Sequence, residues 1–237
     1  MERLDKIVAA QCGLTRSQAR ERIWKGAVAV NGEKTTAIDR KVDPEKDELT
    51  MFGEPLTVRE HLYIMMNKPA GCVSASRDRD EKTVLELLPE EYRRRDMAPA
   101  GRLDKDTTGF LLITNDGQLG HRLLSPKHHV PKTYLAEIAQ PLTDQDIALL
   151  ERGVDIGDET PTLPASVEIP DGETPTNVLL TITEGRYHQV KRMFEAVGKP
   201  VISLHRQSFG ALTLDPSLAP GEYRELTEEE LESWGRF

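Results

Sequence analysis

The densest group of reactive side chains lies between Gly101 and Gly109, directly before an apolar run. Glycine allows sharp turns, and a loop held by a rigid strand is a common place to display reactive groups. This loop contains two carboxylates, Asp104 and Asp106, among cationic neighbours. An Asp with a reference pKa of about 3.9 is ionised near neutral pH, so either group suits nucleophilic attack or ion pairing better than general-acid work. These residues alone do not choose between the two carboxylates, and they also fit a charged surface loop.

A second polar cluster, residues 184–194, runs into a helical pattern. Its apolar side chains recur at the i, i+3, i+4 and i+7 spacing that buries one helix face: Val190, Met193, Phe194 and Val197. Lys191 points away from this face. It can pair with Glu195 on the helix surface, or it can neutralise a carboxylate in a cleft.

Residues 121–134 contain cations and no acid, although the chain as a whole is acidic. An acid-free run that ends in an aromatic residue, here Tyr134, is typical of a nucleic-acid contact, with ordinary core packing as the alternative. The histidines of this run lack a neighbouring Cys or carboxylate to complete a metal site. The chain also has none of the common phosphate-loop, dinucleotide or hydrolase motifs. We therefore expect no metal and no cofactor.

Composition favours a soluble protein, because 38% of the residues are hydrophobic, 30% are charged and the net charge is −9. This balance excludes a protein that binds phosphate by net charge alone, but it permits a local basic face. Residues 1–58 carry no net charge, so the whole excess of acid falls on the rest of the chain. No stretch is apolar enough for a membrane span or a signal peptide, and the two cysteines form no CxxC pair. We expect a cytoplasmic protein that contacts no membrane.

The first part of the chain predicts a small module of two helices and a hairpin. A helical pattern covers residues 4–11, and Thr15 with Gln18 forms a capping box for a second helix. The dipeptide Asn31-Gly32 between two β-prone segments predicts a hairpin with a type I′ turn.

Residues 62–237 mix strands and helices without regular alternation, which predicts an α+β fold. Short apolar or β-rich runs predict strands at 62–66, 110–114, 133–139 and 177–183. Helical patterns fall at 82–88, 118–124, 143–151, 187–197 and 227–233.

The N-terminal residues resemble the S4 RNA-binding module. The matching segments are Arg3-Leu4-Asp5-Lys6, residues 15–20, Ile23 and the Gly26–Gly32 region. Arg16 and Arg20 share one helix face, which periodicity alone reads as a solvated surface. In the S4 family the second helix and the hairpin present basic side chains to structured RNA, so the resemblance implies phosphate contacts for Arg16 and Arg20.

Four motifs in the rest of the chain resemble the pseudouridine synthases, in family order. They are Asn67-Lys68-Pro69-x-Gly71, Gly101-Arg102-Leu103-Asp104-x-x-Thr107-Thr108-Gly109, Lys132-Thr133-Tyr134 and residues 184–194. The chain is most similar to the group that couples an S4 module to a catalytic domain and acts on small-subunit (16S) ribosomal RNA. Thr108 stands where Ser is common, and Lys191 stands where Arg is common. Lys lacks the bidentate fork of Arg.

The resemblance implies a small S4 domain of helix, helix and hairpin at 1–58, a linker at 59–61 and a pseudouridine synthase catalytic domain at 62–237. The catalytic domain is expected to have a mixed, largely antiparallel sheet and a central cleft. The resemblance also implies that the protein, expected to be a monomer, converts a specific uridine of 16S rRNA, or of a small-subunit assembly intermediate, to pseudouridine. A 23S rRNA enzyme of the same family and a non-catalytic S4-type ribosome-binding protein are the alternatives.

The same resemblance implies residue roles. Asp104, rather than Asp106, is the nucleophile, and Lys191 pairs with it. Tyr134 stacks on the target base, and Arg102 fills the gap that is left when the uridine flips out. Further RNA or substrate contacts are expected from Lys68, Thr107, Arg186, His188, Gln189 and Arg192, together with Arg16 and Arg20 of the S4 module.

Overall fold

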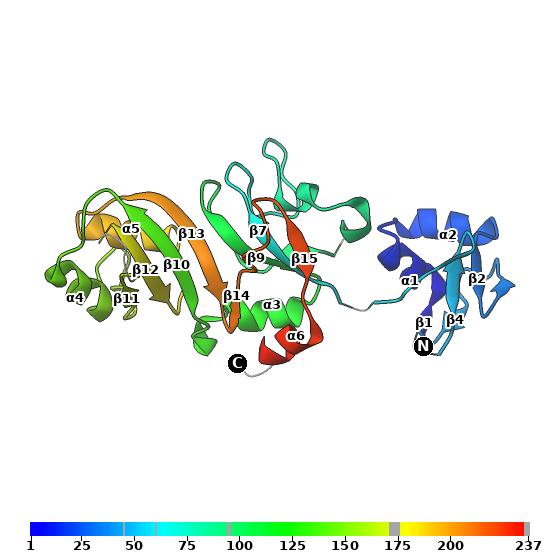
Figure 1. Cartoon of the computed structure of the whole chain (residues 1–237). Coiled ribbons are helices and arrows are strands. Elements are labelled where there is room, and N and C mark those ends of the chain that lie inside the picture. The colour runs from blue at the N-terminus through cyan, green and yellow to red at the C-terminus, as the bar shows by residue number, and fades with distance from the viewer. Residues whose placement is uncertain (45, 60, 94–95, 171–175, 235–237) are drawn as a thin grey trace. The chain divides into compact units, whose positions relative to one another are not determined.

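The chain folds into two compact units in a computed structural model that describes residues 1–44, 46–59, 61–93, 96–170 and 176–234 (Figure 1). The first unit comprises Met1–Leu62 and Leu85–Met97, and the second comprises Tyr63–Val84 and Ala98–Phe237. The predicted domain bounds, 1–58 and 62–237 with a linker between them, stay a prediction.

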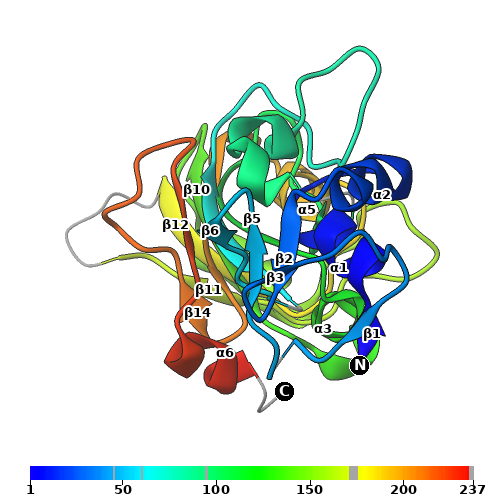
Figure 2. The same ribbon diagram turned by 90° about the vertical axis from the view of Figure 1, so that its right-hand side faces the viewer.

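The first unit packs two helices against a small sheet (Figure 2). The helices are α1 (Leu4–Gln11) and α2 (Arg16–Trp24), and both hydrogen bonds of the predicted Thr15–Gln18 capping box are present. The sheet has the order β3 (Glu33–Lys34), β2 (Val28–Val30), β5 (Leu49–Met51) and β6 (Glu54–Pro55). A separate pair joins β1 (Glu2–Arg3) to β4 (Lys41–Val42).

Alternation along β2 explains how this unit closes. Val28 and Val30 are buried against apolar residues of both helices, whereas Ala29 between them faces outward and is only half-buried. The predicted Asn31-Gly32 turn has φ values of 54° and 80°, as a type I′ hairpin requires.

The second unit is built on one mixed sheet of order β11-β12-β10-β13-β9-β7-β15. Its strands are β7 (Tyr63–Lys68), β8 (Ala98–Pro99), β9 (Thr108–Thr114), β10 (Lys132–Ile138), β11 (Ser166–Glu168), β12 (Asn177–Ile182), β13 (Val201–Phe209), β14 (Leu212–Thr213) and β15 (Tyr223–Glu225). Strands β8 and β14 lie off this path and pair with β9 and β13. Among the described residues every strand pair is antiparallel except β9 with β13. The expected α+β fold with a mixed, largely antiparallel sheet is confirmed.

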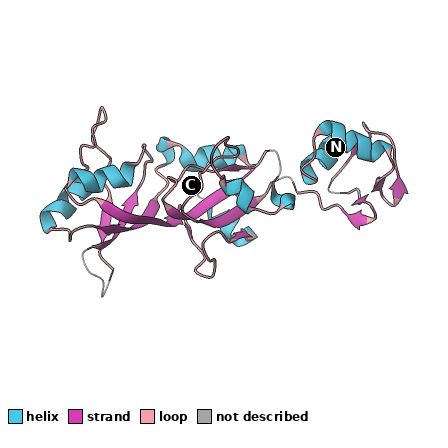
Figure 3. Ribbon diagram, turned by 90° about the horizontal axis from the view of Figure 1, so that it is seen from above, coloured by secondary structure: helices cyan, strands magenta, loops and turns pink. Residues whose placement is uncertain are grey.

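Helices pack beside this sheet, as Figure 3 shows. They are α3 (Gly117–Leu124), α4 (Asp144–Arg152), α5 (Gln189–Ala196) and α6 (Glu228–Trp234), with 3₁₀ turns at Val84–Leu87, Glu90–Tyr92 and Pro126–His128. The helix predicted at 82–88 is therefore wrong in type. The residue before Pro89 is pushed away from helical geometry, which leaves room for a single short turn. In the described part of the chain, no helix is long and apolar enough to cross a bilayer.

Three aromatic rings anchor the core between β9, β13 and α6. Phe110 and Phe209 meet edge to face with their centroids 6.3 Å apart, and the ring of Trp234 lies 6.2 Å from Phe110 and 5.9 Å from Phe209. The Trp234 indole also donates a hydrogen bond to the carbonyl oxygen of Phe209 at 3.1 Å. This bond satisfies the one polar atom of a fully buried side chain, so the final helix is fixed to the sheet.

The parallel contact between β9 and β13 depends on Gly109. Gly109 lies opposite Arg206, its φ is +101°, and a Cβ placed there would lie 2.3 Å from the Arg206 carbonyl oxygen. Only glycine permits so close an approach of two backbones. The loop that contains Asp104 ends directly at this contact.

We expect Gly109→Ala to destabilise the second unit by roughly 3 kcal/mol or more, because it combines a backbone clash with a left-handed φ. Urea denaturation measures this change. The control is Gly117→Ala at the start of α3, where φ is ordinary and nothing lies within 4 Å of the new Cβ. Equal unfolding midpoints for the two variants would contradict the assignment of the β9–β13 contact to Gly109.

Candidate active site

The loop of residues 101–107 is fixed to the sheet through its backbone. The Ser74 hydroxyl accepts a hydrogen bond from the Leu103 amide at 3.0 Å and donates one to the Leu103 carbonyl at 2.9 Å. The Gly71 amide donates to the Lys105 carbonyl at 2.8 Å. Nothing in the local sequence around Ser74 indicates this role, because its partner is 29 residues away.

Lys68, at the end of β7, supports the same loop from beneath. Its ammonium donates to the carbonyl oxygens of Pro69 at 3.0 Å, Asp104 at 3.0 Å and Thr107 at 2.9 Å, with a longer contact of 3.3 Å to Lys105. Burial lowers the pKa of Lys68 from its usual value, and the nearby carboxylates oppose that shift only in part. The side chain is fully buried, and the predicted substrate contact for Lys68 stays a prediction.

Thr107 belongs to the framework of the loop. It is 2% exposed and its hydroxyl has no hydrogen-bond partner among the described residues, whereas its carbonyl receives the Lys68 ammonium. Its predicted substrate contact stays a prediction.

Asp104 lies at the meeting point of this loop and α5. Its Oδ2 is 3.1 Å from the Lys191 ammonium, and its Oδ1 is 3.3 Å from Nε2 of His188. The carboxylate is about one-quarter exposed, so it is held by two partners and still open on one side. Asp106 also contacts Lys191, at 2.6 Å, but it is 74% exposed. The structure thus brings Lys191 to the loop carboxylates rather than to Glu195.

Lys191 is the electrostatic centre of the cluster. Burial lowers the pKa of Lys191, but hydrogen bonds to Asp106 and Asp104 outweigh burial and raise the pKa above its usual value. The hydrogen bond from Lys191 in turn lowers the pKa of Asp106. The protonated form of Lys191 is therefore favoured near neutral pH in its position between the two carboxylates.

The start of α5 differs from the predicted helix at 187–197, because the helix begins at Gln189. His188 precedes it with a left-handed φ of 48°, and this turn aims the imidazole at Asp104. Gln189 is 3% exposed, accepts from the Arg186 amide at 2.9 Å and donates to Glu184 at 2.8 Å. Gln189 therefore shapes the turn, and its predicted substrate contact stays a prediction.

Arg186 and Arg192 hold a neighbouring loop. Arg186 donates to the Thr160 carbonyl at 2.6 Å, and Arg192 donates to the Ile156 carbonyl. Both guanidinium groups also contact the Asp158 carboxylate. Hydrogen bonds from Arg192 and Arg186 lower the pKa of Asp158. These donors are engaged by protein acceptors and support this loop, and the predicted substrate contacts of both arginines stay a prediction.

Tyr134 belongs to a row of residues that crosses four adjacent strands. Lys68 pairs with Gly109, Gly109 with Arg206, and Arg206 with Tyr134. Neighbouring strands are 4.7–4.9 Å apart, which puts the Tyr134 backbone about 10 Å from the end of the Asp104 loop. Tyr134 is 7% exposed, and among the described residues no hydrogen bond joins its phenol to the Asp104 cluster.

Two buried cations flank this tyrosine along the sheet. Arg206 is 2% exposed, donates to the Phe110 carbonyl at 2.7 Å and lies 4.9 Å from the Phe209 ring centroid. Lys132 donates to the Val130 carbonyl at 2.9 Å, and burial, aided by the charge of Arg206, lowers the pKa of Lys132 to about 8. The sequence reasoning missed Arg206, although a charged residue inside a strand of alternating burial is a detectable signal.

The remaining predicted residues are Arg102 on the loop and two arginines of the first unit. Arg102 is exposed. Arg16 and Arg20 flank Asp5 in the first unit, at 3.4 and 2.8 Å. Asp5 is fully buried, and hydrogen bonds from Arg3 and Arg20 hold its pKa well below the usual range. Both arginines stay about half-exposed, so their predicted RNA contacts stay a prediction.

Comparisons with known proteins bear on this geometry. Residues 62–196 match the family model described as RNA pseudouridylate synthase, and residues 2–49 match the S4 domain. The chain belongs to the RNA pseudouridine synthase family. It is 51% identical over 230 residues to the RNA pseudouridine synthase YtzG of Bacillus subtilis, covering 97% of this chain and 96% of that protein. It is also 47% identical to ribosomal small subunit pseudouridine synthase A of Escherichia coli, covering 98% of this chain and 99% of the relative.

A solved structure agrees with the fold of this pseudouridine synthase. A crystal structure described as a pseudouridylate synthase is 45% identical, covers 99% of the chain and superposes with a TM-score of 0.69. The family is one of isomerases, which rearrange a nucleotide already present in RNA. In the described part of this synthase, no three His, Cys, Asp or Glu side chains gather as a metal site.

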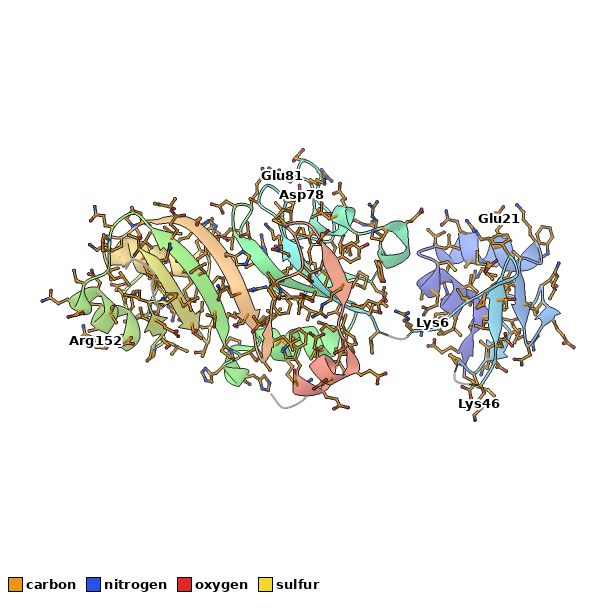
Figure 4. The ribbon with its side chains drawn as sticks, in the orientation of Figure 1. Lys6, Glu21, Lys46, Asp78, Glu81 and Arg152 are labelled. Atoms are coloured by element: carbon orange, nitrogen blue, oxygen red, sulfur yellow. The ribbon has the colours of Figure 1, made fainter. Side chains whose placement is uncertain are left out.

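Replacing Lys68 tests its role beneath the loop of the synthase. We expect Lys68→Met to lower the rate of pseudouridine formation at saturating RNA by about 10- to 100-fold, because loss of this ammonium displaces the loop backbone that carries Asp104. RNA affinity should stay within about twofold of wild type. Single-turnover kinetics and filter binding measure the two effects. The control is Lys105→Met, an exposed cation paired with Glu81, which Figure 4 labels on the loop near Asp78. If Lys68→Met bound RNA more weakly and kept the wild-type rate, Lys68 would act as an RNA contact instead.

The lowered pKa of Lys132 predicts a pH-dependent stability. Below about pH 8 both the folded and unfolded states carry the charge, and burying it disfavours folding. Between about pH 8 and the usual value of 10.5 the folded state loses the proton first, so this cost falls as the pH rises. We expect Lys132→Met to be stabilising near pH 7, with an advantage that shrinks by about 2 kcal/mol near pH 9.5. Urea denaturation at both pH values measures this advantage, and Lys127→Met, at an exposed position, is the control. A difference in unfolding free energy between Lys132→Met and wild type that is the same at both pH values would contradict the prediction.

Proposed function

We propose that this chain converts a uridine of small-subunit (16S) ribosomal RNA to pseudouridine, with Asp104 acting on the ribose. The observation that carries the role of Asp104 is its half-enclosed carboxylate, which contacts Lys191 and His188 while one side stays open. The choice of RNA is supported by relatives named ribosomal small subunit pseudouridine synthase A, which match nearly the whole chain at 47% identity.

The reaction is an isomerisation and needs no external electron carrier. The bond between ribose C1′ and N1 of uracil breaks, the base turns, and C1′ joins C5. The proton lost from C5 is balanced by the proton gained at N1. Asp104 either attacks C1′ or takes a proton from the sugar, and in both cases the carboxylate has to be ionised at the start. The Lys191 ammonium favours that form.

Two more side chains fit this reaction. Tyr134 forms one wall of the base pocket and stacks on the detached uracil, since a flipped base needs an aromatic partner to replace its neighbours. Arg102, exposed on the loop, fills the gap left in the RNA. The substrate is the free 16S RNA or a small-subunit assembly intermediate, and the enzyme acts as a monomer without a metal or other cofactor.

Asp104→Asn tests the nucleophile. The amide has nearly the same shape and no charge, so we expect pseudouridine formation to fall by about 1,000-fold or more while RNA affinity changes by less than about threefold. Chemical mapping of pseudouridine in 16S and 23S transcripts measures the first, and filter binding measures the second. Asp106→Asn is the matched control, since it removes the neighbouring carboxylate that also pairs with Lys191.

The control also sets the outcome that refutes the assignment. If Asp106→Asn lost more activity than Asp104→Asn, the catalytic role would belong to Asp106, the more exposed carboxylate. Modification of the 23S transcript alone would refute the 16S substrate while leaving Asp104 in place. RNA binding with no pseudouridine in either transcript would favour a non-catalytic S4-type binding protein.

A further inference from the structure

The sheet of the first unit contains two hairpin turns of the same backbone shape. Between β2 and β3, Asn31 and Gly32 have φ values of 54° and 80°, and between β5 and β6, Phe52 and Gly53 have φ values of 55° and 90°. Asn and Gly tolerate this left-handed conformation, and they are the usual residues of a type I′ turn. A bulky aromatic residue at the same position is strained.

Packing does not compensate the strain at Phe52. Its side chain is 68% exposed, whereas the apolar residues of the sheet's inner face are buried. The Arg22 guanidinium lies over the ring, 5.7 Å from its centroid. Strain that the fold does not use is a reason to look for a ligand.

Phe52 borders an open hollow of about 480 Å³ on the outer face of this sheet. The lining consists mainly of small residues: Gly26, Ala27, Ala29, Gly32, Lys34, Thr50, Phe52 and Gly53. Lys34 and Thr50 both pair with Ala29, so a small side chain on the central strand forms the floor between two longer ones. Lys34 contributes a positively charged side chain to the lining.

We propose that this hollow seats an unpaired nucleobase of the RNA substrate, stacked on Phe52, with Lys34 and Arg22 facing the adjoining phosphates. The volume falls within the range of small-ligand sites and suits a single nucleotide. Proteins read single-stranded RNA by stacking splayed bases on aromatic rings, and cations beside the ring match the RNA backbone. This site lies at the Phe52 turn and Arg22, on residues other than Arg16 and Arg20 around Asp5. The proposal rests on the proposed function, since RNA is taken as the substrate.

Phe52→Asn gives a test in which stability and binding change in opposite directions. Asn suits the turn, as Asn31 does in the neighbouring hairpin, so the midpoint of thermal unfolding should rise or stay the same. Loss of the stacked base should weaken binding of a 16S transcript by about tenfold. Phe52→Trp, which keeps an aromatic face, should bind within about twofold of wild type.

Salt dependence separates stacking from phosphate contact. The slope of log affinity against log salt reports released counterions, so it should be unchanged in Phe52→Asn and shallower in Lys34→Gln. Trp24 gives a local readout, because it is 71% exposed and ends α2 two residues before Gly26, while Trp234 is fully buried. Bound RNA should protect Trp24 from acrylamide quenching, and this protection should diminish in Phe52→Asn.

Each result decides for or against the site. Wild-type RNA affinity in Phe52→Asn, or equal losses in Phe52→Asn and Phe52→Trp, overturns the proposal. Phe52→Asn could instead keep its affinity for RNA and lose binding to small-subunit particles that contain protein. That result would assign the surface to a ribosomal protein and would also overturn the proposal. Pseudouridine formation is scored separately. RNA binding that depends on Phe52 in a chain that makes no pseudouridine would refute the proposed function and leave the stacking site standing.

Discussion

A single buried ammonium, that of Lys68, fixes the backbone of the loop that carries Asp104. Buried carbonyl groups need donors, and a loop has no ladder of its own to supply them. Lys68 brings its donors to the carbonyls of Asp104 and Thr107 from the end of β7, while β7 is itself paired with β9. The loop is thereby attached to two strands at once, and Asp104 is placed by the sheet rather than by its own flexible segment.

The same row explains why the sheet changes direction here. Gly109 lets β9 approach β13 in parallel, and β13 then carries Arg206 next to Tyr134 on β10. An acid on a loop and a tyrosine on a strand, 30 residues apart in sequence, are thus connected through the pairing of β9 with β13 and of β13 with β10. Substituting Gly109 disturbs this relation without touching a reacting group.

Local sequence patterns predicted the elements better than the partners. The capping box at Thr15, the Asn31 turn and the apolar runs of β7 and β9 are determined by residues close together in the chain. The family resemblance implied substrate contacts for Lys68 and Arg186, and these contacts stay predictions. In the structure both side chains donate to backbone carbonyls, which lie up to 39 residues away in the sequence. Every residue has a carbonyl group, so the sequence does not indicate which one accepts. Tertiary contacts decided which charges face inward.

Lysine side chains balance the carboxylates around Asp104, which allows an acidic chain to bind RNA, itself negatively charged, at this place. Asp104 and Asp106 share Lys191, and Lys68 adds a second positive charge beneath the loop, so these four groups together are neutral in a chain of net charge −9. Neutrality matters because screening is weak in a partly buried site, and an uncompensated carboxylate would repel the RNA backbone. The two lysines are not equivalent. Hydrogen bonds raise the pKa of Lys191 and burial lowers that of Lys68, so the amine beneath the loop is the one whose proton is held less firmly. As the pH rises, Lys68 therefore loses its proton before Lys191 does. The ion pair between Lys191 and Asp104 persists at a pH at which Lys68 has already become neutral.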